Sequence, residues 1–172
     1  MIDVQAKLVP LLPQAGRLVW NIRRLIDGAE ALGVAIGATE QYPRGLGETV
    51  PELAARLKER HEKITFSCGS AAPLFDGWRE RGLHRVLIAG IEAHVCVQQT
   101  VLDLLANGWR VYLAIDAISA RHEIDYRTAL RRMESAGATL TTTEAALFEW
   151  CRVAGTLQFK QISKLVQETC EA

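Results

Sequence analysis

Short apolar runs alternate with longer stretches of helical periodicity along most of the chain. The apolar runs are rich in β-branched residues, and they lie at 34–39, 63–67, 86–91, 111–115 and 138–142. Helical periodicity covers residues near 14–31, 51–61, 94–107, 125–136, 143–154 and 158–168. A run as apolar as VLIAGI at 86–91 is typical of a strand that is covered on both faces, as in a parallel sheet.

The repeated strand and helix order predicts an α/β fold. We expect three layers, in which a doubly wound, mainly parallel sheet of about six strands carries helices on both faces. Asp3-Val4-Gln5 resembles the end of a first strand, with only Met1 and Ile2 ahead of it. Either this first strand is very short, or the numbering begins downstream of the natural start. We expect the second, with residues 1–172 forming one domain whose first strand is truncated at the N-terminus.

Composition and charge exclude several classes of function. Twenty basic residues balance twenty acidic ones, so no net field draws the chain to nucleic acid or to an anionic membrane. No apolar run approaches the roughly 20 residues of a membrane helix. The cysteines form no CxxC pair, and the histidines lack the HxH or HxxxH spacing of zinc ligands. We expect a reduced, cytoplasmic protein with no metal and no cofactor, and with no nucleic-acid or membrane partner.

The carboxyl ends of the predicted strands are the place to look for chemistry, because open α/β sheets bind ligands in the crevice outside them. Cys96 falls there, at the start of the helical pattern that follows the run at 86–91. Backbone N–H groups and the positive end of a helix dipole stabilise a thiolate at such a place. The same N–H groups can hold an oxyanion. Taken alone, a cysteine on an apolar helix face is more often a buried structural residue.

A carboxylate and a cation accompany this thiol. Asp3 follows the first strand, and Lys63 lies in the short run that can face the same crevice. Taken alone, Asp3 is more often a cap or turn residue, and Lys63 a solvated surface residue. His94 is a poor direct base for Cys96, because residues two apart on a helix point to nearly opposite sides. Together, Asp3, Lys63 and Cys96 fit the acid, cation and thiol of a cysteine hydrolase.

The stretch GIEAHVCVQQTVLDLLANGWRVYLAIDAISAR, which begins at Gly90, strongly resembles the core motif of the isochorismatase-like cysteine hydrolases. Further similar stretches are DVQ at 3–5, TEQYPRGLG at 39–47, KITFS at 63–67 and TTTEAALFEW at 141–150. FKQISKLV at 159–166 resembles the closing helix of the isochorismatase-domain hydrolase branch. The resemblance covers almost the whole chain in order. It implies an open parallel sheet with a catalytic triad that falls on Asp3, Lys63 and Cys96.

The resemblance also implies a non-proline cis peptide bond between Ile91 and Glu92, which would aim backbone N–H groups at the substrate oxygen. The oxyanion donors would be the N–H groups of Glu92 or Ala93 and of Cys96. Nicotinamidases of the superfamily bind a metal through an aspartate and paired histidines after the second strand. TEQYPRGLG offers no histidine at that place, so neither a metal nor nicotinamidase activity is expected.

Residues near the expected crevice are candidates for contacts with the substrate. The candidates are Gln5, Glu40, Gln41, Tyr42 and His94. For the stretch around Tyr42 a second interpretation stays open, in which Tyr42-Pro43 only shapes a loop.

The retained cysteine favours acyl chemistry, because the true isochorismatases of this family cleave a vinyl ether without depending on it. We expect a hydrolase of a small-molecule substrate that cleaves an amide-like carbon–nitrogen bond through a thioester. One alternative is an isochorismatase-type vinyl-ether hydrolase, and another is a non-catalytic or redox-sensing binding protein on the same fold. The family context also predicts a homo-oligomer, dimeric or larger.

Overall fold

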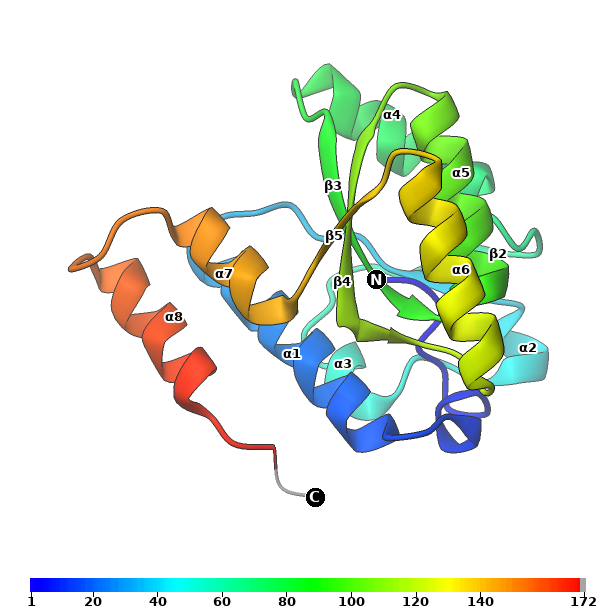
Figure 1. The fold of residues 1–172 in the computed structure, drawn as a ribbon, viewed down its shortest axis with the longest axis horizontal. Coiled ribbons are helices and arrows are strands. Elements are labelled where there is room, and N and C mark those ends of the chain that lie inside the picture. The colour runs from blue at the N-terminus through cyan, green and yellow to red at the C-terminus, as the bar shows by residue number, and fades with distance from the viewer. Residues whose placement is uncertain (171–172) are drawn as a thin grey trace.

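Parallel strands form a twisted sheet in the middle of the molecule (Figure 1). The computed structural model describes residues 1–170, and within them the strands are β1 (Thr39–Gln41), β2 (His61–Lys63), β3 (Arg85–Ile91), β4 (Arg110–Ser119) and β5 (Thr139–Thr141). β1 pairs with β2, and β4 pairs with both β3 and β5. Ile2 joins the two groups, because it makes parallel bridges to Thr39 of β1 and to Gly90 of β3.

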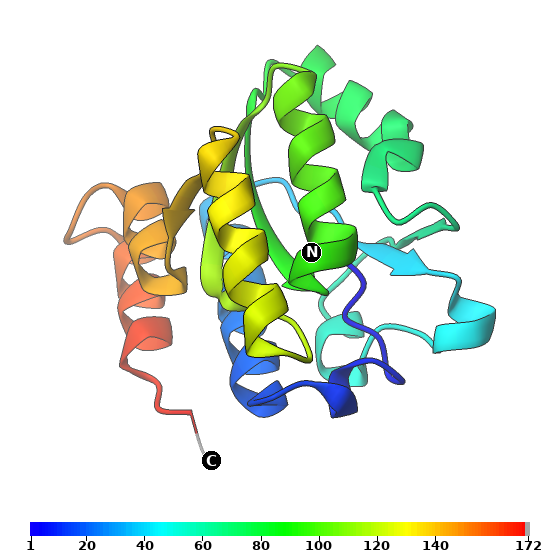
Figure 2. The same ribbon diagram turned by 45° about the vertical axis from the view of Figure 1, so that its right-hand side comes forward.

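Helices cover both faces of this sheet. On one face lie α4 (Ala72–Glu80), α5 (Gln98–Ala106) and α6 (Glu123–Ser135), and on the other lie α1 (Ala15–Leu32), α3 (Pro51–Ala54) and α7 (Thr143–Cys151). In Figure 2, α5 and α6 stand in front of the sheet and the blue α1 stands behind it. α8 (Leu157–Gln167) packs outside, against α1 and α7. Shorter turns are η1 (Val9–Leu11), α2 (Pro43–Leu46), η2 (Cys68–Ala71) and η3 (Ala93–Val97). None of the helices within residues 1–170 has the length and apolar character needed to cross a membrane.

Two hydrophobic cores lie on the two faces of the sheet. Ile88 of β3 and Leu113 of β4 pack with α5 and α6, whereas their neighbours Ala89 and Ala114 pack with α1 and α7. Successive side chains of a strand point to opposite faces, so β3 and β4 each contribute to both cores. The predicted three-layer α/β fold with a parallel sheet is confirmed.

Several predicted boundaries are wrong. The strand predicted at 34–39 is reduced to β1, which begins at Thr39, because residues 34–38 form no regular ladder. The helix predicted at 51–61 ends at Ala54, since the chain must turn there to enter β2. α4, at 72–80, was not predicted, because its sequence contains a proline and a glycine that weaken the helical signal.

Candidate active site

Asp3 and Lys63 form a buried ion pair at the carboxyl end of the sheet. The Lys63 Nζ lies 2.6 Å from Asp3 Oδ2, and both side chains are fully buried. The other carboxylate oxygen of Asp3 accepts a hydrogen bond from Thr39 Oγ1 at 2.8 Å. A buried charge is tolerated only when it is paired and hydrogen-bonded. Both charges of this pair meet that condition.

Lys63 is held by three further oxygens. Its Nζ donates to Gln41 Oε1 at 2.7 Å and to the carbonyls of Phe66 and Thr65 at 3.0 and 3.2 Å. β2 ends at Lys63 instead of beginning there as predicted, and the loop that follows folds back over the ammonium group. The prediction of a strand at 63–67 is therefore wrong, because the carbonyls of this loop bond to a side chain and not to a neighbouring strand.

Cys96 lies in η3, the π-helical turn that connects β3 to α5, and it is 7% exposed. Burial is the main reason why the pKa of the Cys96 thiol is raised, and the charge of Asp3 and a hydrogen bond to it raise the pKa further. Lys63 acts in the opposite direction without reversing the shift. From the sequence, the position of Cys96 at a helix start predicts that a thiolate is favoured. In the structure desolvation outweighs that effect, so the resting group is a neutral thiol.

Cys96 lies in the first turn of the helical segment that follows β3. The peptide bond between Ile91 and Glu92 is cis, at the position named in the sequence analysis. The Glu92 carbonyl accepts two N–H groups of the π-helical turn. The first N–H groups of a helix have no acceptor within the helix, and those of Ala93 and Cys96 belong to this class. They are the local candidates for binding an oxyanion.

Gln5 and Gln41 hold the site together from within. Gln5 is fully buried, and its Nε2 donates to the carbonyls of Gln41 and Gly47 at 2.9 and 2.6 Å. Gln5 Oε1 accepts the Gln41 N–H at 2.8 Å. The Gln41 side chain then spans from Lys63 Nζ to the Ile64 carbonyl, the latter at 2.6 Å. Both amides are occupied by the protein itself, so these residues position Lys63 and the β1 loop.

Glu40 and Tyr42 flank Gln41 but differ from each other in exposure. Glu40 is buried, and its carboxylate accepts the N–H and Oγ1 of Thr49, both at 2.7 Å, and lies 3.0 Å from Arg60 Nε. Tyr42 is 50% exposed. Of these two predicted substrate contacts, only Tyr42 has a side chain that is open to a ligand.

His94 and Glu92 contact the region around the start of α6. His94 Nε2 lies 3.9 Å from Asp125 Oδ2, and Glu92 Oε1 accepts a hydrogen bond from Arg121 Nε at 2.8 Å. The ring of His94 is thus directed to a carboxylate of α6. This contact agrees with the argument that His94 is not the direct base for Cys96.

Thr100 was not among the predicted site residues, and Thr39 was predicted to lie at the end of a strand beside the crevice but was given no role, although both residues touch the site. Thr39 Oγ1 bonds to Asp3 and lies 3.5 Å from Cys68 Sγ. Thr100 Oγ1 donates to the Cys96 carbonyl at 2.6 Å and accepts the Cys68 N–H at 2.9 Å. The sequence contains one indication for Thr100, which lies four residues after Cys96. A threonine in a helix commonly donates its hydroxyl to the carbonyl of the residue four positions earlier.

Comparisons with known proteins point in one direction. The family described as isochorismatase domain matches residues 1–145. The chain is 39% identical over 169 residues to isochorismatase domain-containing protein 2A of Mus musculus, covering 98% of this chain and 81% of that protein. The structure of MAR1 ribonuclease from Caenorhabditis elegans superposes with a TM-score of 0.92 and 37% identity, covering 99% and 89% of the two chains.

A more distant neighbour shows the fold alone. It is the YcaC gene product of Escherichia coli, described as an octameric hydrolase of unknown specificity. Its TM-score is 0.87 and its identity 24%, with 95% of this chain and 83% of that chain covered.

Proposed function

Because the chain belongs to the isochorismatase-domain family of hydrolases, we propose that it hydrolyses a carbon–nitrogen bond of a small amide-like molecule through a thioester on Cys96. The observation that carries this proposal is the buried Asp3–Lys63 ion pair, 2.6 Å long, beside the Cys96 thiol. Desolvating two charges is costly. A carboxylate, a cation and a thiol gathered at the carboxyl end of a parallel sheet are the parts of a nucleophilic site.

The attack couples proton transfer to bond formation. Burial raises the pKa of the Cys96 thiol, so the thiol loses its proton as the sulfur approaches the substrate carbonyl. Asp3 is the base within reach, and Lys63 keeps its carboxylate aimed. The sulfur bonds to the carbonyl carbon while the carbonyl electron pair moves to oxygen. The backbone N–H groups of Ala93 and Cys96 then stabilise that oxyanion.

The second half of the proposed reaction releases the products and restores the Cys96 thiol. The proton on Asp3 passes to the leaving nitrogen as the carbon–nitrogen bond breaks, which releases an amine or ammonia and leaves a thioester. Water, deprotonated by Asp3, then attacks the thioester and restores the thiol. The balance is one amide-like molecule and one water consumed, and one acid and one amine formed.

Intact-mass spectrometry tests this proposal. The chain and Cys96→Ala are incubated with small amides, carbamoyl compounds and isochorismate. We expect a mass increase only where Cys96 is present, together with released amine or ammonia. Cys68→Ala is the matched control, because Cys68 is also buried and feels the charges of Asp3 and Lys63. It should still acquire the adduct.

Other outcomes would point to the rival functions. Full turnover by Cys96→Ala would contradict the thioester and favour the vinyl-ether hydrolase. An absence of both adduct and turnover, with reversible oxidation of Cys96, would favour a redox-sensing role. The C. elegans neighbour is named a ribonuclease, so a labelled RNA oligonucleotide belongs in the same panel. RNA cleavage that survives Cys96→Ala would overturn the proposed chemistry.

We also propose that the chain self-associates in the cytoplasm as a dimer or larger assembly. The E. coli neighbour is described as octameric, and Cys68, Cys96 and Cys151 form no disulfide, as expected in a reducing compartment. Light scattering on the eluting protein should give a multiple of the chain mass. A monomer at micromolar concentration would contradict self-association.

A further inference from the structure

Thr39 contacts Asp3 twice, once through its backbone and once through its side chain. The Thr39 carbonyl accepts the Asp3 N–H at 3.1 Å, and Thr39 Oγ1 donates to Asp3 Oδ1 at 2.8 Å. Lys63 donates to the other carboxylate oxygen, Oδ2. A single residue at the start of β1 therefore holds both the main chain and one carboxylate oxygen of the proposed base.

The backbone of Asp3 needs this support. Its φ is 52°, in the left-handed region that residues other than glycine seldom adopt. Such a conformation is strained, and it persists only where the surrounding contacts fix it. The two bonds from Thr39 fix Asp3 at its amide and at its carboxylate, on either side of the strained Cα.

The hydroxyl proton of Thr39 has one direction. An ionised carboxylate only accepts hydrogen bonds, so the hydroxyl must donate its one proton to Asp3. Cys68 Sγ lies 3.5 Å from Thr39 Oγ1, and the Cys68 S–H is the donor in that contact because the hydroxyl proton is already used. Burial raises the pKa of the Cys68 thiol, which keeps this proton in place. Hydrogen bonds therefore run from Cys68 through Thr39 to Asp3.

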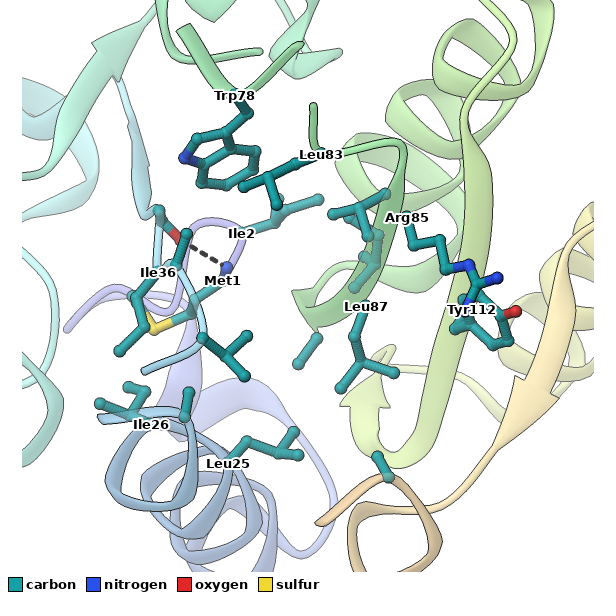
Figure 3. Close-up of a pocket in the computed structure, with 18 of the residues that line it drawn as sticks. Met1, Ile2, Leu25, Ile26, Ile36, Trp78, Leu83, Arg85, Leu87 and Tyr112 are labelled. Atoms are coloured by element: carbon teal, nitrogen blue, oxygen red, sulfur yellow. Dashed lines mark hydrogen bonds between the residues drawn. The ribbon is translucent and has the colours of Figure 1, made fainter. Parts of the chain in front are cut away.

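The space beside this chain of hydrogen bonds is apolar. Thr39 and Cys68 form part of the wall of an apolar cavity of about 490 Å³, which lies behind Met1 between β3 and residues 33–37 (Figure 3). Among residues 1–170, the polar partners of the Thr39 hydroxyl are Asp3 Oδ1 and Cys68 Sγ. The hydroxyl thus has no competing acceptor that would turn it away from Asp3.

We propose that Thr39 is a positioning residue that keeps the carboxylate of Asp3 directed at the Cys96 thiol. This inference rests on the proposed cysteine chemistry. The Cys96 S–H donates to Asp3, and a base accepts a proton efficiently only while it stays within reach and aligned. Lys63 alone would leave the carboxylate free to turn about its bond to Cβ. With Thr39 on Oδ1 and Lys63 on Oδ2, its plane is fixed.

Two substitutions separate the hydroxyl from the shape of the side chain. Thr39→Val keeps the branched shape and removes the donor, whereas Thr39→Ser keeps the donor. Activity is measured on the amide or carbamoyl compound of the panel above that is turned over fastest. Thr39 is 3% exposed, so Thr39→Val should lower kcat at least about tenfold and leave KM within about twofold. Thr39→Ser should retain at least about half of the parent kcat.

Thr49→Val is the matched control. Thr49 is also buried, and its Oγ1 donates to the carboxylate of Glu40 at 2.7 Å. The substitution removes the same kind of hydrogen bond without touching Asp3, so it should lower the Tm but keep kcat within about twofold of the parent. A loss of kcat as large as that of Thr39→Val would overturn the proposal, because the effect would then reflect packing in general.

Crystal structures of the parent and of both Thr39 variants make the test independent of turnover. In Thr39→Val the carboxylate plane of Asp3 should turn by at least about 30°, and in Thr39→Ser it should keep its direction. An unchanged carboxylate in Thr39→Val, or an equal loss of kcat in Thr39→Ser, would overturn the proposal. If the parent shows no turnover, the thioester mechanism fails, and the direction of the carboxylate still decides whether Thr39 positions Asp3.

Discussion

The gap between β1 and β3 has two ends that differ in how their polar groups are satisfied. At the carboxyl end, Asp3 and Lys63 are buried, and each is bound by further side-chain or carbonyl oxygens. At the amino end, two backbone edges face an apolar cavity. β3 flanks both ends, whereas on the other side β1 flanks the carboxyl end and residues 33–37, which form no strand, line the cavity. The difference is whether backbone lies between them, so the chemistry at the site depends on a short stretch of main chain.

Gly90 marks the point where the filled end begins. Its φ is 130°, and a Cβ built on it would lie 2.1 Å from the Ile2 carbonyl oxygen. Only glycine lets the first residues approach β3 so closely. The position of Asp3 is thus set by a backbone contact at Gly90 as well as by its own ion pair.

Lys63→Met should have the largest effect on stability, because it removes the ion pair at the carboxyl end of the gap. Removing one partner of a buried ion pair leaves the Asp3 charge uncompensated, which costs about 3–5 kcal/mol of unfolding free energy. Urea unfolding measures it. Lys58→Met is the control: Lys58 is exposed, so its replacement should stay within about 0.5 kcal/mol. If Lys63→Met lowers the free energy of unfolding by less than about 1 kcal/mol, the Asp3–Lys63 pair contributes little to stability.

Gly90→Ala should come next, because it pushes the backbone of Ile2 away from β3. We expect a loss of about 3 kcal/mol from strain at positive φ together with the collision. Gly82→Ala separates the two causes: Gly82 has a φ of 75° but nothing within 4 Å of its added Cβ. That control should lose only about 1 kcal/mol. If thermal unfolding shows equal losses of stability for Gly90→Ala and Gly82→Ala, the close contact between Gly90 and Ile2 does not contribute to the loss.

The rate of alkylation of Cys96 tests whether the thiol at the carboxyl end is protonated in the absence of substrate. Its raised pKa leaves little thiolate at pH 8, and the thiolate is the reactive form. Iodoacetamide should therefore modify Cys96 at least about tenfold more slowly than the half-buried Cys151, as followed by peptide mapping. The rate at Cys96 should keep increasing above pH 9. Faster labelling of Cys96 than of Cys151 at pH 8 would mean that the thiolate forms before substrate binds.

The smallest expected effect is a pH dependence of stability, which arises from the Met1 amino group at the cavity end. The pKa of the Met1 amino group is lowered by burial from its ordinary value of 8.0. Below pH 8 the unfolded chain therefore binds more protons than the folded chain. Stability should rise as pH increases toward 8 and fall as pH decreases, by at most about 1.4 kcal/mol per pH unit.

Nα-acetylation of Met1 is the control for this pH effect, because an acetylated nitrogen carries no titratable charge. The difference in Tm between the free and the acetylated chains should shrink as pH increases from 6 to 8. A difference that stays constant over that interval would show that the buried amino group does not titrate there.

The layers of the fold could be predicted because they depend on the spacing of apolar residues along the chain. A two-faced apolar run such as VLIAGI predicts a covered strand, and the structure places its residues alternately in two cores. The grouping of Asp3, Lys63 and Cys96 could be anticipated for a similar reason. Carboxyl ends of parallel strands meet at one edge of a sheet, whatever their separation along the chain.

The contacts within the site could not be predicted, because they depend on distances across the fold. The sequence shows Gln5 and Gln41 as polar residues near the crevice. It does not show that their amides are taken by carbonyls and by Lys63. For Cys96, its place at a helix start is visible in the sequence, but its burial is not. The predicted sign of its pKa shift was therefore wrong.

The four oxygens around Lys63 have a consequence for substrate charge. An ammonium group has three N–H donors, and Asp3, Gln41 and two carbonyls already share them. A carboxylate or phosphate on a substrate could recruit Lys63 only by releasing one of these acceptors. Lys63 is thus an internal counter-ion and not an anion receptor, and we expect the acyl group that meets Cys96 to be uncharged.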